Sequence, residues 1–189
     1  MVSMKGDLLE LIKRRKTTFE FSEKKVGGAG IKKIVEAGRW SPSSHNSQPW
    51  KFIIVRDRKA IEKLMEISYY GFFHSEPAAI IVAIMEHTKK KMPGMHRGKN
   101  AFMAAYHPYI DIGMPVLSMA CEAESLGIDS CILSLQVKEA NRLLGVPVGS
   151  EAILALGIGY EKKGAFAAKR AREGYSGIVF SEKYGKKGQ

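Results

Sequence analysis

The sequence has few cysteines and no long apolar segment. Its 189 residues include two cysteines, Cys121 and Cys131, too few for a disulfide framework, and no His/Cys cluster has zinc-binding spacing. The longest apolar run, residues 78–85, is far shorter than the roughly 20 residues of a membrane-spanning helix, and it predicts a buried strand. The N-terminus lacks the apolar stretch and cleavage site of a secretory signal. We therefore expect a protein of the reducing cytoplasm, with no metal and no membrane partner.

Negative charge is also scarce: 19 acidic residues face 30 Lys and Arg, so the formal net charge is +11. An excess of positive charge suits nucleic acid, an acidic membrane surface or phosphorylated small molecules. The basic residues are scattered over several expected elements, and no nucleic-acid recognition motif occurs, so we expect no nucleic-acid partner. The length suits a single domain, residues 1–189.

Apolar periodicity predicts mixed helices and strands along the whole chain, and leaves the strand directions open. Asp7 is expected to cap the first helix, Gly27–Gly30 to form a loop, and Gly127 to end the longest helix, in which Pro115 predicts a kink or a later start. The connection 87–108 is long enough for a lid or substrate loop. The expected helices are 7–15, 31–38, 58–67, 109–126 and 137–144, and the expected strands are 52–55, 79–85, 130–133, 152–157 and 178–180.

Two basic segments are candidates for binding an anion. Lys13–Lys16 is followed by two threonines, and its guanidinium groups could hold phosphate oxygens bidentately. Taken alone, this segment is better explained as cations that answer the macrodipole at a helix C-terminus. Arg170 and Arg172 alternate in an expected extended segment, so they could converge on one anion, although a lone charge run is usually a solvated face.

The segment Arg39–Trp50 is a polar loop rich in hydroxyls and carboxamides. Pro42 and Pro49 reduce its conformational freedom, which would pre-organise its donors and acceptors. Asn46 and Gln48 each offer a carbonyl and an amino group, and this suits the edge of a heteroaromatic ring. An ordinary helix-to-strand loop with Asx-turns is the alternative.

Candidates for a protein nucleophile are weak. Cys121 and Cys131 fall in an expected helix and an expected strand, where cysteine usually acts as a small buried hydrophobe. The five histidines show no paired metal spacing, and there is no Gly-X-Ser-X-Gly elbow for a Ser-His-Asp triad. The residues alone therefore point to no catalytic side chain.

Taken in chain order, these segments resemble the FMN-dependent nitroreductase family, over nearly the whole chain. The most specific stretch is Ser41-Pro-Ser-Ser-His-Asn-Ser-Gln-Pro-Trp50, followed by the strand 51–55. The other matching segments are Arg15-Lys-Thr-Thr-Phe-Glu-Phe21, Asp111-Ile-Gly113 leading to Leu126-Gly127, Leu144-Gly-Val-Pro147, Gly157-X-Gly-Tyr160, and Arg170-X-Arg172 before Ile178-Val-Phe180.

The resemblance implies an α+β fold in which a central, mainly antiparallel sheet is flanked by helices. It implies an intertwined homodimer with FMN at the interface. It also implies an oxidoreductase with ping-pong chemistry, in which NADH or NADPH reduces the flavin and the flavin reduces a nitroaromatic, a quinone or a related acceptor. Because the flavin carries the electrons, no catalytic protein residue is expected.

The resemblance also assigns cofactor-binding residues by position. The residues that would hold the FMN phosphate and ribityl chain are Arg15, Lys16, Thr17, Arg170 and Arg172. Those that would line the flavin, several of them from the partner subunit, are Pro42, Ser43, Ser44, Asn46 and Gln48. The backbone groups of Leu133 and Ser134 would lie near N5 of the ring.

The chain departs from the family pattern at two places. Phe19 stands where many members have a third basic residue, and residues 132–136 lack a glycine often found there. Two alternatives stay open: a flavin-binding protein of the same fold with a different reaction or without nicotinamide-driven turnover, and, less favoured, a basic nucleic-acid-binding protein.

Overall fold

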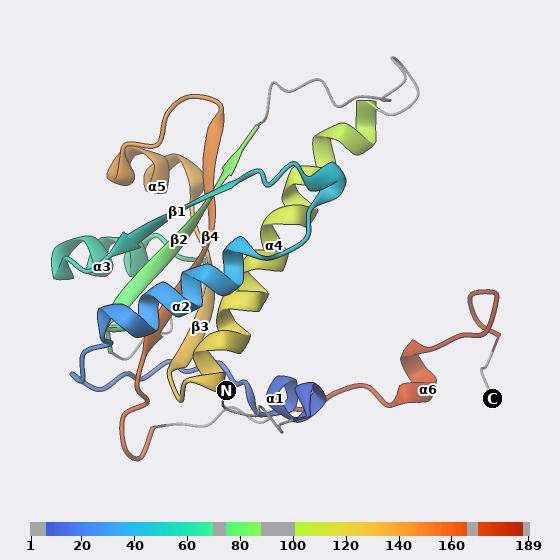
Figure 1. Cartoon of the computed structure of the whole chain (residues 1–189), viewed down its shortest axis with the longest axis horizontal. Helices are drawn as coiled ribbons and strands as arrows, with labels where there is room; N and C mark the ends of the chain where they lie inside the picture. The colour runs from blue at the N-terminus through green and yellow to red at the C-terminus, as the bar shows by residue number, and fades with distance from the viewer. Residues whose placement is uncertain (1–6, 70–74, 88–100, 166–169, 187–189) are drawn as a thin grey trace.

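The computed structural model describes residues 7–69, 75–87, 101–165 and 170–186. Helices and strands alternate without segregation along the chain (Figure 1). The helices are α1 (Leu8–Arg14), α2 (Gly28–Arg39), α3 (Arg58–Glu66), α4 (Ala101–Ser125), α5 (Val137–Leu144) and α6 (Tyr175–Ile178), with a short 3-10 turn η1 (Ser44–Asn46); the strands are β1 (Trp50–Val55), β2 (Ala79–Glu86), β3 (Asp129–Ser134) and β4 (Ser150–Gly159).

The four strands form one antiparallel sheet in the order β1-β2-β4-β3. The two central strands pair in register from Ala79 with Ile158, and a bulge at Ala83/Ile84 shifts the pairing beyond it. The antiparallel sheet flanked by helices, and the four strands predicted between residues 52 and 157, are confirmed.

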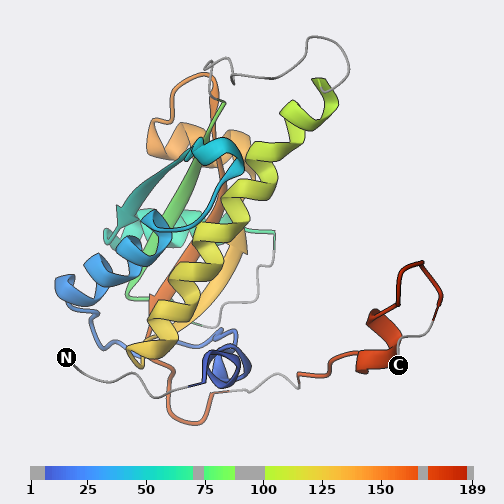
Figure 2. The same cartoon turned by 45° about the vertical axis from the view of Figure 1, so that its right-hand side comes forward.

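Helices cover both faces of the sheet. Side chains at alternate positions of β2 enter two different apolar clusters: Ile81 packs in one with α2 and α4, and Ile80 packs in the other with α3 and α5. This arrangement explains why β2 is apolar at nearly every position, since neither face of a central strand meets water. Figures 1 and 2 show α2 and α4 crossing the sheet together on one side.

The prediction of a loop at Gly27–Gly30 is wrong, because α2 begins at Gly28. Glycine in a helix costs about 1 kcal/mol relative to alanine, so local preference favoured a loop. Close packing favours the helix instead: a Cβ on Gly30 would lie 3.2 Å from Ile128 Cδ1, and one on Gly38 would lie 2.9 Å from Met119 Cγ. The small residues let α2 approach its neighbours.

One other helix boundary and one other element differ from prediction. The longest helix starts at Ala101 and not near Tyr109, and it continues through Pro108 and Pro115, so Pro115 marks no late start. Its buried side chains, from Ile112 to Ala123, pack on the sheet and offset the hydrogen bonds that the prolines remove. The strand predicted at 178–180 is also wrong, because Tyr175–Ile178 is a short helix; three apolar residues alone do not distinguish the two.

Other local signals are confirmed. The Asp7 carboxylate accepts a hydrogen bond from Leu9 N at 3.0 Å and caps α1, and Gly127 follows α4 at φ +67°. Residues 101–108 of the predicted lid belong to α4, whereas residues 88–100 lie outside the described residues. Beyond residue 169, the described C-terminal segment with α6 extends away from the sheet in both views (Figures 1 and 2).

Candidate functional site

The polar loop between α2 and β1 is anchored on α4 by a buried carboxylate. Asp111 is 1% exposed, and both of its oxygens lie 3.1 Å from Ser44 N, which donates to them. The hydroxyls of Ser44 and Ser47 also donate to this carboxylate, at 3.2 and 3.4 Å. At the start of the loop, Ser41 Oγ donates to Ser118 Oγ at 2.8 Å, one and a half to two helical turns further along α4.

The same loop has an uncommon backbone. His45, Asn46 and Gln48 have φ values of 53°, 52° and 47°, in the left-handed region that costs an L-residue about 1–2 kcal/mol. Gln48 N donates to Ser43 Oγ at 2.9 Å, and Gln48 Nε2 donates to Asn46 Oδ1 at 3.0 Å. Residues in such conformations persist where their surroundings hold them, and they cluster at functional sites. The predicted Asn46 and Gln48 carboxamides therefore lie together, exposed and hydrogen-bonded to each other.

The two tryptophans that flank the loop have different surroundings. Trp50 starts β1 and is 6% exposed in the core, whereas Trp40 is 75% exposed. The Trp40 indole nitrogen donates to Glu36 Oε1 at 2.8 Å, and the Arg39 guanidinium donates to both oxygens of the same carboxylate. The Arg39 and Trp40 hydrogen bonds lower the pKa of Glu36 to about 2. Trp40 is thus held in place at the surface beside the loop.

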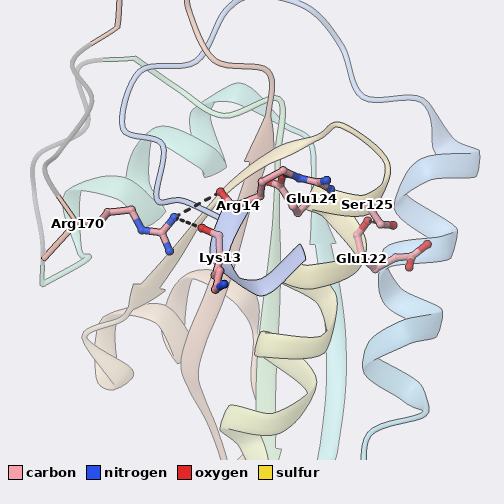
Figure 3. Close-up of polar contacts among 6 residues, drawn as sticks. All are labelled: Lys13, Arg14, Glu122, Glu124, Ser125 and Arg170. Carbon is pink, nitrogen blue, oxygen red and sulfur yellow. Dashed lines mark hydrogen bonds and ion pairs between the residues drawn. The ribbon is translucent and has the colours of Figure 1, made fainter. Parts of the chain in front are cut away.

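A cavity of about 420 Å³ gathers cations from both ends of the chain. Its walls are Ile12, Lys13, Arg15, Leu117, Arg170 and Arg172. Arg170 Nη1 donates to Lys13 O at 2.8 Å and lies 3.4 Å from Arg14 O, so it satisfies carbonyls at the C-terminal end of α1 (Figure 3).

The charges around this cavity are unbalanced. Lys13 forms an ion pair with Glu10 at 2.7 Å, and Arg14 pairs with Glu124 at 3.1 Å, which ties α1 to α4. Among the described residues, Arg15, Arg170 and Arg172 form no ion pair, and no carboxylate lines the cavity. Convergent arginines without a carboxylate are a suitable binding site for phosphate.

Other predicted site residues lie outside this cavity. Lys16 forms an ion pair with Glu161, and Thr17 bridges to Ser130 at the start of β3. The Leu133 side chain is fully buried in the core, and Ser134 O accepts a hydrogen bond from Tyr69 N at 3.0 Å.

The polar loop and the cation cavity are separate groups of predicted residues. The loop meets α4 at Asp111 and Ser118, and the cation cavity meets it at Leu117. Within the described ranges, no hydrogen bond or ion pair joins the two groups. Asp111 is a residue of this site that the sequence patterns did not predict. The signal for it was its position as the only charged residue between Ala101 and Cys121, because an acid in an apolar helix is rarely buried without partners.

A second cavity, of about 440 Å³, lies at the C-terminal end of β1, and no predicted site residue lines it. Its wall includes Phe21, Lys25 and Arg56, and an ion pair of Arg58 with Glu76 at 2.8 Å. Positive charge is therefore spread over more than one concave surface.

The described part of the chain offers no metal cluster and no reactive thiol. No group of three or more His, Cys, Asp or Glu among these residues could hold a metal ion. Cys131 is 2% exposed, and burial raises the pKa of its thiol to about 12; burial also raises the pKa of the half-buried Cys121. None of the described helices has the length and apolarity needed to cross a membrane.

Comparison with known proteins identifies relatives. The family model described as Nitroreductase family matches residues 12–160. A protein of Archaeoglobus fulgidus with the provisional name NADH dehydrogenase/NAD(P)H nitroreductase is 27% identical over 162 residues, which cover 82% of this chain and 86% of that protein.

Solved structures share the fold. A nitroreductase family protein from Streptococcus pneumoniae superposes with a TM-score of 0.78 at 20% identity, over 93% of this chain and 100% of the other. The structure of B. megaterium NfrA2 superposes with a TM-score of 0.81 at 18% identity, over 95% of this chain and 75% of that chain.

Proposed function

Because the chain belongs to the nitroreductase family, we propose that it is an FMN-dependent oxidoreductase that uses NADH or NADPH to reduce nitroaromatics, quinones or related acceptors. The observation that carries the proposal is the cation cavity, in which Arg15, Arg170 and Arg172 converge without a carboxylate. A phosphomonoester carries a charge near −2 at neutral pH, so guanidinium groups arranged in this way fit the FMN phosphate.

The predicted residues differ in how well they are placed to bind FMN. The three arginines of the cavity would hold the phosphate, whereas Lys16 is paired with Glu161 and would contribute less. Thr17, next to this pair, would hold the ribityl chain. The Leu133 side chain is buried, so only backbone groups of Leu133 and Ser134 are available to the flavin.

The polar loop would supply the surroundings of the ring. Pro42, Ser43, Ser44, Asn46 and Gln48 belong to a segment whose shape is set by Asp111. The hydride chemistry between a nicotinamide and the acceptor would be supplied by a flavin held at this site. The protein binds and orients it, and the two carboxamides offer hydrogen bonds to the donor and acceptor edge of the ring.

A homodimer would complete this site. The loop and the cation cavity are separate groups in one chain, and the proposal brings the loop of one subunit to the cavity of its partner. Exposed apolar side chains support a second copy as the partner. Tyr106, Ile110 and Leu117 follow one face of α4 at helical spacing and are 48%, 55% and 52% exposed, and Leu8 and Leu9 on α1 are also exposed. Size-exclusion chromatography with light scattering measures this assembly directly.

The test of the function is the visible absorption spectrum of the purified protein with FMN, before and after anaerobic addition of NADH or NADPH. Flavin bands that bleach with one nucleotide, and return when a quinone is added, would support the oxidoreductase and identify its donor. Bound flavin that neither nucleotide bleaches would favour a flavin-binding protein with another reaction. A protein that binds no FMN would refute the proposal. We further propose that residues 1–189 act as one domain.

A further inference from the structure

The hydrogen bonds of Asp111 have no role in the proposed hydride chemistry. It is almost fully buried, and burying a carboxylate is unfavourable unless hydrogen bonds satisfy its oxygens. Among the described residues, all the hydrogen bonds that this carboxylate accepts come from the polar loop: from the backbone N–H of Ser44 and from the hydroxyls of Ser44 and Ser47. The hydrogen bonds of the carboxylate therefore stabilise the loop and not the helix to which Asp111 belongs.

These contacts enclose two of the three left-handed residues of the loop, and the third follows directly after them. Ser44 immediately precedes His45 and Asn46, and Ser47 lies between Asn46 and Gln48. None of the three left-handed residues is glycine, so each tends to leave this conformation when released. A hydrogen bond to a charged group is among the stronger ones in proteins, and such bonds act here on both sides of His45 and Asn46.

We propose that Asp111 is the positioning residue for flavin binding: it holds residues 43–48 in the shape in which Asn46 and Gln48 present their carboxamides together. The inference rests on the proposed function, because the ligand it serves is the flavin ring. Asp111 does not itself contact the ring in this arrangement. Its effect passes through the backbone of the loop.

The direct test is Asp111→Asn, which keeps the size of the side chain and removes one of its two acceptor oxygens. The Kd for FMN should rise about tenfold or more. The Kd for riboflavin should rise by the same factor, because the loop serves the ring and not the phosphate. The visible band shape of any remaining bound flavin should change, and hydrogen exchange at Ser44 should accelerate in the FMN-free protein.

Rescue separates positioning from general stability. His45 is exposed, and His45→Gly makes the left-handed conformation free of steric cost at that position. In the Asp111→Asn background this change should recover at least threefold of the lost FMN affinity. The matched control is Ile112→Val on the same helical turn, which loses a buried methyl group but keeps every loop hydrogen bond; its FMN Kd should stay within twofold of the wild-type value.

The outcomes distinguish the two proposals. Wild-type protein that binds no FMN overturns the proposed function, and the flavin-positioning role of Asp111 with it. Wild-type protein that binds FMN, together with an Asp111→Asn variant of unchanged Kd and unchanged Ser44 exchange, overturns the role of Asp111 alone. An affinity loss that His45→Gly does not relieve, and that Ile112→Val reproduces, also overturns it, because general destabilisation then accounts for the effect.

Discussion

Replacing Arg170 with glutamine should weaken FMN binding selectively through the phosphate. Arg170 lines the cavity in which three arginines lack an ion pair, and its Nη1 is directed to Lys13 O at 2.8 Å, which orients the guanidinium. The group has five N–H donors, so this contact leaves others for a ligand. Loss of a charge-assisted hydrogen bond costs roughly 1.5–3 kcal/mol, which corresponds to roughly a 10- to 150-fold change in Kd.

The expected rise in the Kd for FMN lies at the low end of that range, near tenfold, because Arg170 is exposed and solvent screens its charge. Flavin fluorescence titration measures Kd for FMN and for riboflavin, which lacks the phosphate. The Arg170→Gln variant should bind riboflavin within about twofold of the wild type, and its FMN affinity should depend less steeply on salt.

The control is Arg142→Gln, which removes another exposed arginine, on α5, that lines a different cavity. It should leave both Kd values unchanged. Equal losses for FMN and riboflavin in Arg170→Gln would show that the arginine does not act on the phosphate, and unchanged FMN binding would remove the cavity from the proposed site.

Three further outcomes follow from particular side chains. The Cys131 thiol, whose pKa burial raises to about 12, should resist iodoacetamide at pH 7 in the native protein and react on denaturation, as mass spectrometry would record. Because the pKa of Glu36 is lowered to about 2, its stabilising contribution is present above pH 4.5 and is lost as pH falls toward 2. The indole N–H resonance of Trp40 should shift with a midpoint well below 4.5; a midpoint at 4.5 would contradict the hydrogen bonds. Gly159→Ala should destabilise the fold by about 1–3 kcal/mol in urea unfolding, because its Cβ would lie 2.6 Å from Phe21 Cδ1; a smaller loss would mean that the ring moves aside.

Local features of the chain were predictable because their causes are local. The apolar run at 79–85 predicted a strand, Asp7 predicted a cap, and Gly127 predicted the end of the longest helix; each depends on residues within a few positions. The start of α2 was not predictable in this way. Glycine disfavours a helix locally, and the packing of Gly30 against Ile128, which no local pattern shows, accompanies the helix that begins at Gly28.

The candidate site was also predictable in its residue types and not in its contacts between distant segments. The residue types indicated what each segment could bind, because guanidinium groups suit a phosphate and carboxamides suit the edge of a heteroaromatic ring wherever they lie. The flavin itself was implied only by the resemblance of the ordered segments to the nitroreductase family. Sequence spacing could not show that Arg170 meets Lys13, 157 positions away, or that Asp111 holds Ser44 from another element.

The sequence by itself therefore determined most of the helices and strands and the chemistry available to the site, since periodicity and residue type are properties of short segments. Only the tertiary structure decided which cations share a cavity and which buried carboxylate accepts hydrogen bonds from the loop. These depend on contacts between distant segments, and packing of α4 against the sheet, α1 and the loop brings those contacts about.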